Sequence, residues 1–169
     1  MIDLSKAAEM FSIKPDGESL MRMWALAEKM PGGTALFSKL VGRMAPYSGT
    51  IGAKVVDLAP GRARLELEDH KAVRNHLDSI HAIALANLAE MSSGLAMLAG
   101  LPTGMRGILT KIEVEYTKKA RGTLTAVAEV EPPVEGYEGP LVLPVTVRDE
   151  AGDVVVDGQF HWKIGPARS

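Results

Sequence analysis

The segment from Asn75 to Glu90, NHLDSIHAIALANLAE, holds residue types and spacings that suit chemistry on a carbonyl group. Ser79 is a good N-cap for a helix that begins at Ile80. The first backbone N–H groups of such a helix, near Ala82, have no partner inside it and lie at the positive end of its dipole. They could polarise a carbonyl oxygen, as an oxyanion hole does. The small side chain of Ala82 would let an acyl group approach the backbone closely.

Glu90 supplies a second group, a carboxylate in the middle of the same helix among apolar residues. Burial without a partner would raise its pKa, which suits a general base near neutral pH. The alternative is a structural acid satisfied by a neighbour such as Ser93. His81 and Glu90 are nine residues apart, about 13 Å along a helix, so one helix cannot bring both to one bond. Two paired chains could, which predicts a homodimer, or a dimer of dimers, with shared sites.

Length and composition limit the classes of function. The chain has 169 residues, 46% hydrophobic and 24% charged, which is typical of one globular domain. A net charge of −2 excludes a general nucleic-acid binder. The absence of cysteine excludes disulfides, zinc ribbons and thiol nucleophiles. The four histidines lack the helical or strand spacing of metal ligands, so no metal site is expected.

Two segments bear on localisation. The first residues, MIDLSKAAEM, have neither a basic start nor a continuous apolar stretch, so no signal peptide is expected and the cytoplasm is the default compartment. Residues 81–101 are apolar and long enough to span a bilayer. Glu90 would be costly at the bilayer centre, so the segment predicts a buried core helix and no membrane span.

The hydrophobic pattern predicts the elements that position these groups. Residues 1–45 read as a helical N-terminal extension, with helices over 18–30 and from an N-cap at Thr34 to Pro46. Residues 46–169 form the main domain. It is predicted to contain two strands, a long apolar helix and four more strands, at 50–58, 62–68, 79–99, 108–116, 123–130, 141–148 and 154–164.

This order predicts an α+β protein. Six antiparallel strands make a sheet with one hydrophobic face, and a helix that is apolar nearly all round must be covered nearly all round. A sheet curled around the long central helix satisfies both demands. That arrangement is the hotdog fold.

The same segment resembles the motif of the PaaI-like branch of hotdog thioesterases. In that branch an Asn is followed, after five residues, by His-Gly-Gly, and an acidic residue stands nine positions after the His. Asn75, His81 and Glu90 match these positions, whereas Ala82 and Ile83 replace the two glycines. The amino-acid sequence of this segment is more similar still to that of a branch whose members carry a domain of unknown function, often with an added helical N-terminus.

The resemblance covers about residues 48–165 and implies hydrolysis of an acyl-CoA or a similar thioester. The amide of Ala82 would hold the thioester carbonyl, and Glu90 would be the general base or nucleophile. Asn75 would orient the attacking water or Glu90; its alternative is an Asx turn that closes the loop. No resident cofactor is implied, because CoA would be the leaving group.

Further residues are candidates for binding the substrate. Lys118, Lys119 and Arg121 join two strands and could dock the phosphates of CoA, although a solvated turn is the alternative. Three other candidates lie close to the helix start. In addition, four methionines of the N-terminal helices could line a tunnel for the acyl chain, with simple core packing as the alternative. These residues are Arg74, His76 and Ser79, and Met21, Met23, Met30 and Met44.

Two rival functions stay open. A hotdog hydratase or dehydratase would use His81 together with Glu90 as acid and base. A non-catalytic acyl binder would use the helix start and a tunnel to hold its ligand, and the Ala82-Ile83 departure from Gly-Gly favours it.

Overall fold

The computed structural model describes residues 16–167. Residues 1–10, for which the sequence predicts no signal peptide, lie outside the described residues. The N-terminal helices are α2 (Gly17–Ala27), α3 (Gly33–Met44) and α4 (Pro46–Gly49). They precede the other elements, which are β1 (Lys54–Ala59), β2 (Arg62–Leu67), the 3-10 turn η1 (Lys71–Val73), α5 (Ala82–Gly100), β3 (Met105–Tyr116), β4 (Leu124–Glu129), β5 (Gly139–Arg148) and β6 (Val154–Pro166).

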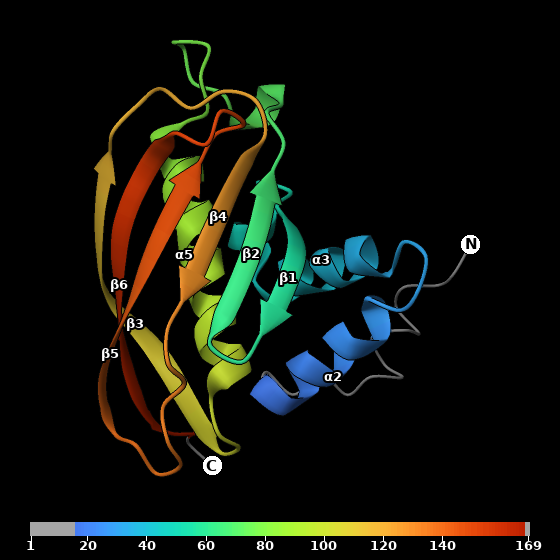
Figure 1. Ribbon diagram of the computed structural model, residues 1–169, viewed down its shortest axis with the longest axis vertical. Coiled ribbons are helices and arrows are strands. Elements are labelled where there is room, and N and C mark those ends of the chain that lie inside the picture. Colours follow the sequence, from blue (N-terminus) through green and yellow to red (C-terminus); the bar gives the residue numbers. More distant parts are fainter. Residues whose placement is uncertain (1–15, 168–169) are drawn as a thin grey trace.

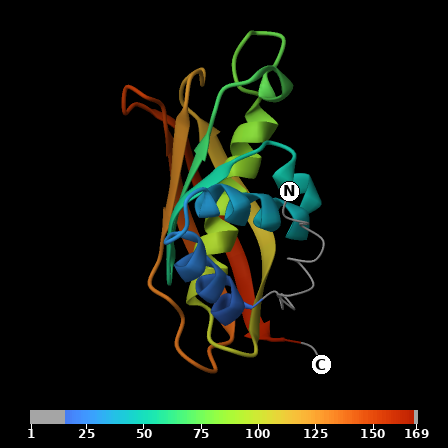
Figure 2. The ribbon, with the colours of Figure 1, turned by 90° about the vertical axis from the view of Figure 1, so that its right-hand side faces the viewer.

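The six strands form one antiparallel sheet in the order β1-β2-β4-β5-β6-β3 (Figure 1). The alternation along β2 places Ala63, Leu65 and Leu67 on the inner face, where all three are fully buried. Helix α5 runs along this inner face, as the side view in Figure 2 shows. The predicted hotdog fold, a sheet curled around a central helix, is confirmed.

Helix α5 forms the centre of the core. By length and composition it is the one helix among the described residues that could cross a membrane, but 67% of its apolar window is buried inside the structure. Leu88, Ala89 and Ala96 have no exposed surface. Strands β2, β4 and β5 contact it from the sheet. The apolar surface of α5 is therefore used for packing, as the sequence predicts for a core helix.

The N-terminal helices cover the side of α5 that the sheet leaves open (Figure 2). Asp16 caps α2 by accepting a hydrogen bond from the Ser19 N–H at 2.8 Å. Trp24 of α2 packs edge-to-face on Phe37 of α3, with ring centroids 5.1 Å apart. Ser38 of α3 accepts the Val55 N–H at 2.9 Å, so α3 covers the free edge of β1.

Two predicted element starts are wrong. Helix α3 begins at Gly33 after an N-cap at Gly32, whose φ of 73° needs glycine, and not after Thr34. The first strand begins at Lys54 instead of residue 50, because residues 46–49 form α4, with Pro46 at its first turn.

Strict alternation along residues 108–116 predicts one face for Ile108, Thr110, Ile112, Val114 and Tyr116. The pairing with β6 agrees for residues 112–116, but Ile108 lies opposite the exposed Lys163 and so faces the other side. The register between β3 and β6 shifts just after Leu109, which marks a β-bulge. Leu109 lies opposite Trp162 and Ile112 lies opposite Phe160, and both partners are buried. Leu109, before the bulge, and Ile112, after it, therefore both lie on the inner side of the sheet. The one extra residue of the bulge reverses the alternation between them.

Candidate functional site

Helix α5 begins later than its sequence predicts. Its first residue is Ala82 instead of Ile80, and its N-cap is His81 instead of Ser79. The His81 Nδ1 accepts the Ile83 N–H at 3.0 Å. His81 is therefore placed as a capping residue at the helix start, with its Nδ1 lone pair engaged.

The late start has a tertiary cause. The Ile80 N–H donates to the Ala120 carbonyl at 2.9 Å, and the His81 N–H donates to the Val73 carbonyl at 2.8 Å. These bonds hold residues 80 and 81 extended against two neighbouring segments. The capping preference of Ser79 is overridden, and Ser79 is instead buried below the loop.

The Ala82 amide is left available at this start. None of the hydrogen bonds within residues 16–167 uses the Ala82 N–H, whereas the next amide is taken by His81. Ala82 lines an open cavity of about 350 Å³, together with Asn75, Ser79, Lys118 and Lys119. The structure thus brings an unengaged helix-start amide and four of the predicted site residues to one cavity.

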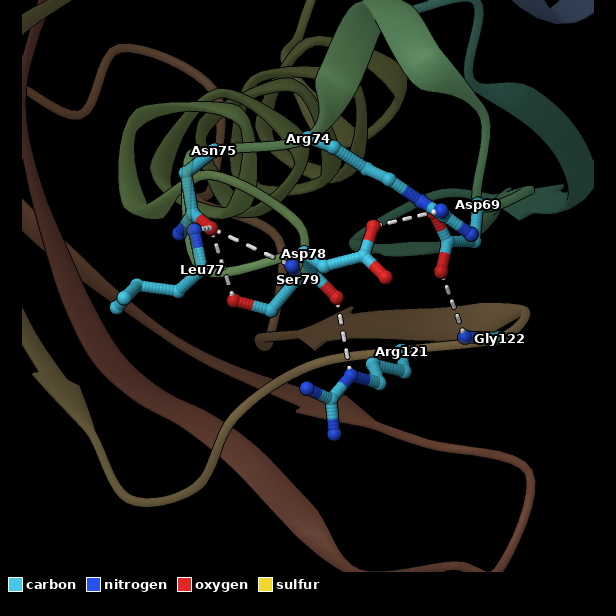
Figure 3. A network of polar contacts seen from close by, with 8 residues as sticks. All are labelled: Asp69, Arg74, Asn75, Leu77, Asp78, Ser79, Arg121 and Gly122. Atoms are coloured by element: carbon cyan, nitrogen blue, oxygen red, sulfur yellow. Dashed lines mark hydrogen bonds and ion pairs between the residues drawn. The ribbon is translucent and has the colours of Figure 1, made fainter.

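Asn75 closes the loop before the helix (Figure 3). Its Oδ1 accepts the Leu77 N–H at 2.9 Å, the Ser79 N–H at 3.3 Å and the Ser79 hydroxyl at 3.2 Å. This is the Asx-turn arrangement. The Asn75 side-chain nitrogen has no hydrogen bond among the residues that the structure describes, so only this end of the amide could orient a water.

Arg74 belongs to an ion-pair network that fixes the same loop (Figure 3). Its Nε donates to Asp69 at 2.7 Å and its guanidinium donates to Asp78 at 2.8 Å. Asp69 also accepts the Gly122 N–H, and the Arg121 Nε donates to the Asp78 carbonyl at 3.0 Å. Arg74 and, secondarily, the Gly122 N–H hold the pKa of Asp69 below its usual range. The network ties the end of β2 to the loops on both sides of the helix start.

The predicted phosphate-binding side chains differ in whether their positive charges are already paired with carboxylates. Lys118 pairs with Asp149 at 2.7 Å and with Asp153 at 2.6 Å, and these carboxylates raise its pKa. Lys119 forms no ion pair in the described part of the chain, and Arg121 uses only its Nε on a carbonyl. The positive charge available to a ligand therefore comes from Lys119 and Arg121, while Lys118 is neutralised, as Arg74 is.

Glu90 lies in a second, apolar cavity of about 240 Å³. No hydrogen bond or ion pair within residues 16–167 reaches its carboxylate. The Ser93 hydroxyl donates to the Glu90 backbone carbonyl at 2.9 Å and not to the side chain, so Ser93 does not satisfy the acid. Burial raises the pKa of Glu90. A half-buried carboxylate with a raised pKa and no protein partner is suited to taking a proton from a bound molecule.

The walls of this cavity come from α5 and from the three N-terminal helices within residues 16–167. Leu20 belongs to α2, Met44 to α3, Ser48 to α4 and Leu98 to α5. Of the four methionines that could line a tunnel, only Met44 borders this cavity. Met23 is buried in the core, Met21 packs against it, and Met30 is 58% exposed.

The two cavities are separate within one chain. They share no lining residue, and Ala82 and Glu90 are eight residues apart, about 12 Å along α5. His76 is exposed and borders neither cavity. A reaction that needs both the amide and the carboxylate would require a second copy of the chain.

Two residues near the site escape the sequence analysis. The Tyr116 hydroxyl donates to the Ala82 carbonyl at 3.0 Å, and burial raises the pKa of Tyr116. Asn87 is 8% exposed, and its side chain makes no hydrogen bond to any described residue. Asn87 could have been identified from the sequence, because it is a polar residue in an apolar helix. Nothing in the sequence indicates that Tyr116 contacts the helix start.

Comparisons with known proteins agree with this architecture. Residues 33–164 match the model of the family described as a domain of unknown function, DUF4442. A protein solved by structural genomics is 32% identical, with a TM-score of 0.76 over 88% of this chain and 98% of its own. No curated protein matches the chain.

Two further solved structures share the fold. A Pseudomonas aeruginosa protein of unknown function, described as a probable thioesterase, is 21% identical, with a TM-score of 0.70 over 82% of this chain and 97% of its own. A hypothetical thioesterase from Streptococcus pneumoniae, solved with coenzyme A, is 18% identical, with a TM-score of 0.62 over 76% of this chain and 99% of its own.

Proposed function

The chain belongs to the DUF4442 family and has the hotdog fold, and on that premise we propose that it hydrolyses acyl thioesters. The observation that carries this proposal is the Glu90 carboxylate. It lies on the central helix, in an apolar cavity, with a raised pKa and no partner within the described residues. A structural acid would normally be paired. An unpaired one is maintained at a cost in stability, which is typical of a functional group.

The proposed reaction uses water as the nucleophile. The Glu90 carboxylate takes a proton from water while the water oxygen attacks the thioester carbonyl carbon. The Ala82 N–H donates to the carbonyl oxygen as it becomes negative. When the tetrahedral intermediate collapses, the C–S bond breaks and the thiolate receives the proton from Glu90. Asn75 would orient the water through its side-chain nitrogen, and CoA would leave as a product.

A shared site in a homodimer is part of this proposal. Strand β3 is an edge of the sheet and is 12 residues long (Figure 1). It exposes Ile108 by 49% and both Ile112 and Tyr116 by 44%. A long, exposed edge strand with apolar side chains favours pairing with another chain. Pairing of two copies along β3 would bring the helix start of one copy toward Glu90 of the other.

The thiol part of the substrate would lie at the helix start. Lys119 lines the cavity of Ala82, and Arg121 follows it closely in the same loop. Their uncommitted charges would bind the phosphates of CoA. The Streptococcus pneumoniae neighbour solved with coenzyme A supports this choice of substrate.

A non-catalytic acyl binder is the second candidate. Ile83, which stands where the PaaI-like motif has glycine, is 55% exposed beside the free amide and could hinder a substrate there. A hydratase or dehydratase has less support, because the His81 Nδ1 is engaged in capping α5.

Thiol release, followed with a thiol-reactive dye, tests the proposed function on short, long and aromatic acyl-CoAs. Glu90→Gln should lower kcat by at least about 100-fold, the usual loss on removal of a general base. Glu129→Gln makes the same chemical change at an exposed position on β4 and should leave the rate unchanged. Equal rates in the two variants, or no release from any thioester, would contradict the proposal.

A further inference from the structure

We propose that the cavity between α5 and the N-terminal helices holds the acyl chain of the substrate and limits it to a medium length of about nine or ten carbons. This rests on the proposed function, because it assigns the acyl group to the site of Glu90. The N-terminal helices would then form the wall that limits the length of the acyl chain.

The lining of the cavity indicates an alkyl occupant. Glu90 is its one charged residue and Ser48 its one hydroxyl among the lining residues, which are otherwise apolar. Leu20 and Val41 are 2% and 7% exposed, whereas Met44 is 40% exposed. The closed end is therefore aliphatic and the open end lies near Met44. A chain whose reacting carbon stays beside Glu90 would bury its methylenes toward Leu20 and Val41.

The cavity volume sets the number of carbons. An apolar cavity of about 150 Å³ accommodates benzene, which corresponds to roughly 25 Å³ per carbon atom. On that scale, the cavity of about 240 Å³ holds about nine or ten carbons.

The chain-length limit is a property of this chain's N-terminal helices. Leu20 comes from α2, which precedes the family-matched residues 33–164. Met44 and Ser48 come from the α3 and α4 segment, so residues of three helices line the cavity opposite α5. Removal of any one of these walls would lengthen or open the space for the chain.

Gly94 offers a way to change this volume gently. A Cβ added at Gly94 would lie 3.4 Å from Trp162 Cη2 and 3.9 Å from Glu90 Oε1, both ordinary contact distances. The added methyl therefore occupies space beside Glu90 without forcing its neighbours apart. Replacement of a helical glycine by alanine also favours the helix, so Gly94→Ala is expected to fold.

Calorimetric binding of S-alkyl pantetheines, which cannot be hydrolysed, tests the cavity independently of turnover. For chains of four to sixteen carbons, the affinity of the wild type should rise about fourfold per added carbon, which corresponds to about 0.8 kcal/mol per buried methylene. It should level off near ten carbons. Gly94→Ala should level off about one carbon earlier, and Leu98→Ala, which removes three carbons from the wall, about three carbons later.

Gly165→Ala is the matched control, because a Cβ there meets no atom within 4 Å and Gly165 does not border the cavity. It should leave the plateau unchanged. Thermal unfolding of each variant verifies the fold. Absent binding, an affinity that does not depend on chain length, or a plateau that Gly94→Ala and Leu98→Ala leave in place would overturn the inference.

The two proposals fail separately. A plateau that shifts as expected, without thiol release from any thioester, would retain the acyl cavity and reject hydrolysis. Thiol release that depends on Glu90, with an unshifted plateau, would retain hydrolysis and reject this cavity as the acyl site. A change in oligomeric state on Gly94→Ala in place of a shifted plateau would assign the cavity to contact with a second copy, and so also reject it.

Discussion

Ala82→Pro removes the proposed oxyanion donor and should keep the start of α5 in place. Ala82 is the first residue of α5, and proline is favoured at that position because its missing N–H would have no helical partner. His81 has φ −65° and ψ 138°, the extended conformation that a residue before proline prefers. The Ala82 carbonyl, which accepts the Tyr116 hydroxyl, is retained. The chain should therefore adopt the same fold without this amide.

The expected losses follow from these contacts. The Ala82 N–H has no hydrogen bond within residues 16–167, so its removal breaks none and the stability should change by less than about 0.5 kcal/mol. For a chain of this size, that is a shift in Tm of no more than about 2 °C. Loss of one oxyanion donor should lower kcat by about 10²–10³, which is about 2.7–4 kcal/mol of transition-state stabilisation.

Thiol release and thermal unfolding of Ala82→Pro should be compared with those of Ala82→Ser, which keeps the amide and a small side chain. The serine variant should retain most of the activity. If the proline variant unfolds normally and its kcat matches that of the serine variant, Ala82 does not hold the oxyanion.

Five further predictions concern Glu90 and the groups around the start of α5. Because burial raises the pKa of Glu90, the rate should rise with pH as Glu90 ionises, above the range of an ordinary glutamate. The same raised pKa in the folded state means that Glu90 stabilises the fold most below its unfolded pKa and loses this contribution as pH rises through the folded pKa. Glu90→Gln should therefore raise Tm at pH 7 and lose this advantage in acid; a lower Tm at pH 7 would contradict the account. Asn75→Ala should cost about 1–3 kcal/mol by removing an acceptor of three hydrogen bonds, whereas Asn75→Asp should retain the stability measured by denaturant unfolding. His81→Ala should cost about 1 kcal/mol as a lost cap, and His81→Asp should restore both stability and activity unless His81 is an acid or base. Reversing the charges of Lys119 and Arg121 should raise KM for acyl-CoA much more than KM for acyl-pantetheine; equal effects would exclude phosphate binding.

The fold was predictable where the signal is local. The alternation along residues 62–67 identifies a strand with Ala63, Leu65 and Leu67 inside, and this is how β2 packs. The start of α5 was not predictable, because hydrogen bonds of residues 80 and 81 to distant segments override the capping preference of Ser79. The bulge in β3 was equally hidden, since it depends on register with β6.

The candidate site was predictable in part for the same reason. Apolar neighbours along the helix indicate that Glu90 is buried, and its environment follows from that pattern. The partners of Lys118 are Asp149 and Asp153, more than thirty residues away, so no local pattern reveals that its charge is neutralised. The apolar cavity around Glu90 likewise depends on how the N-terminal helices pack on α5.

The central claim is that Glu90 and the Ala82 amide act on one thioester from two chains. It is tested most directly by thiol release from dimers formed by coexpressing Glu90→Gln and Ala82→Pro. In a mixed dimer one site carries both substitutions and the other carries neither, so random assembly should restore about a quarter of the wild-type activity. Activity no greater than the mean of the two variants alone would contradict the shared site.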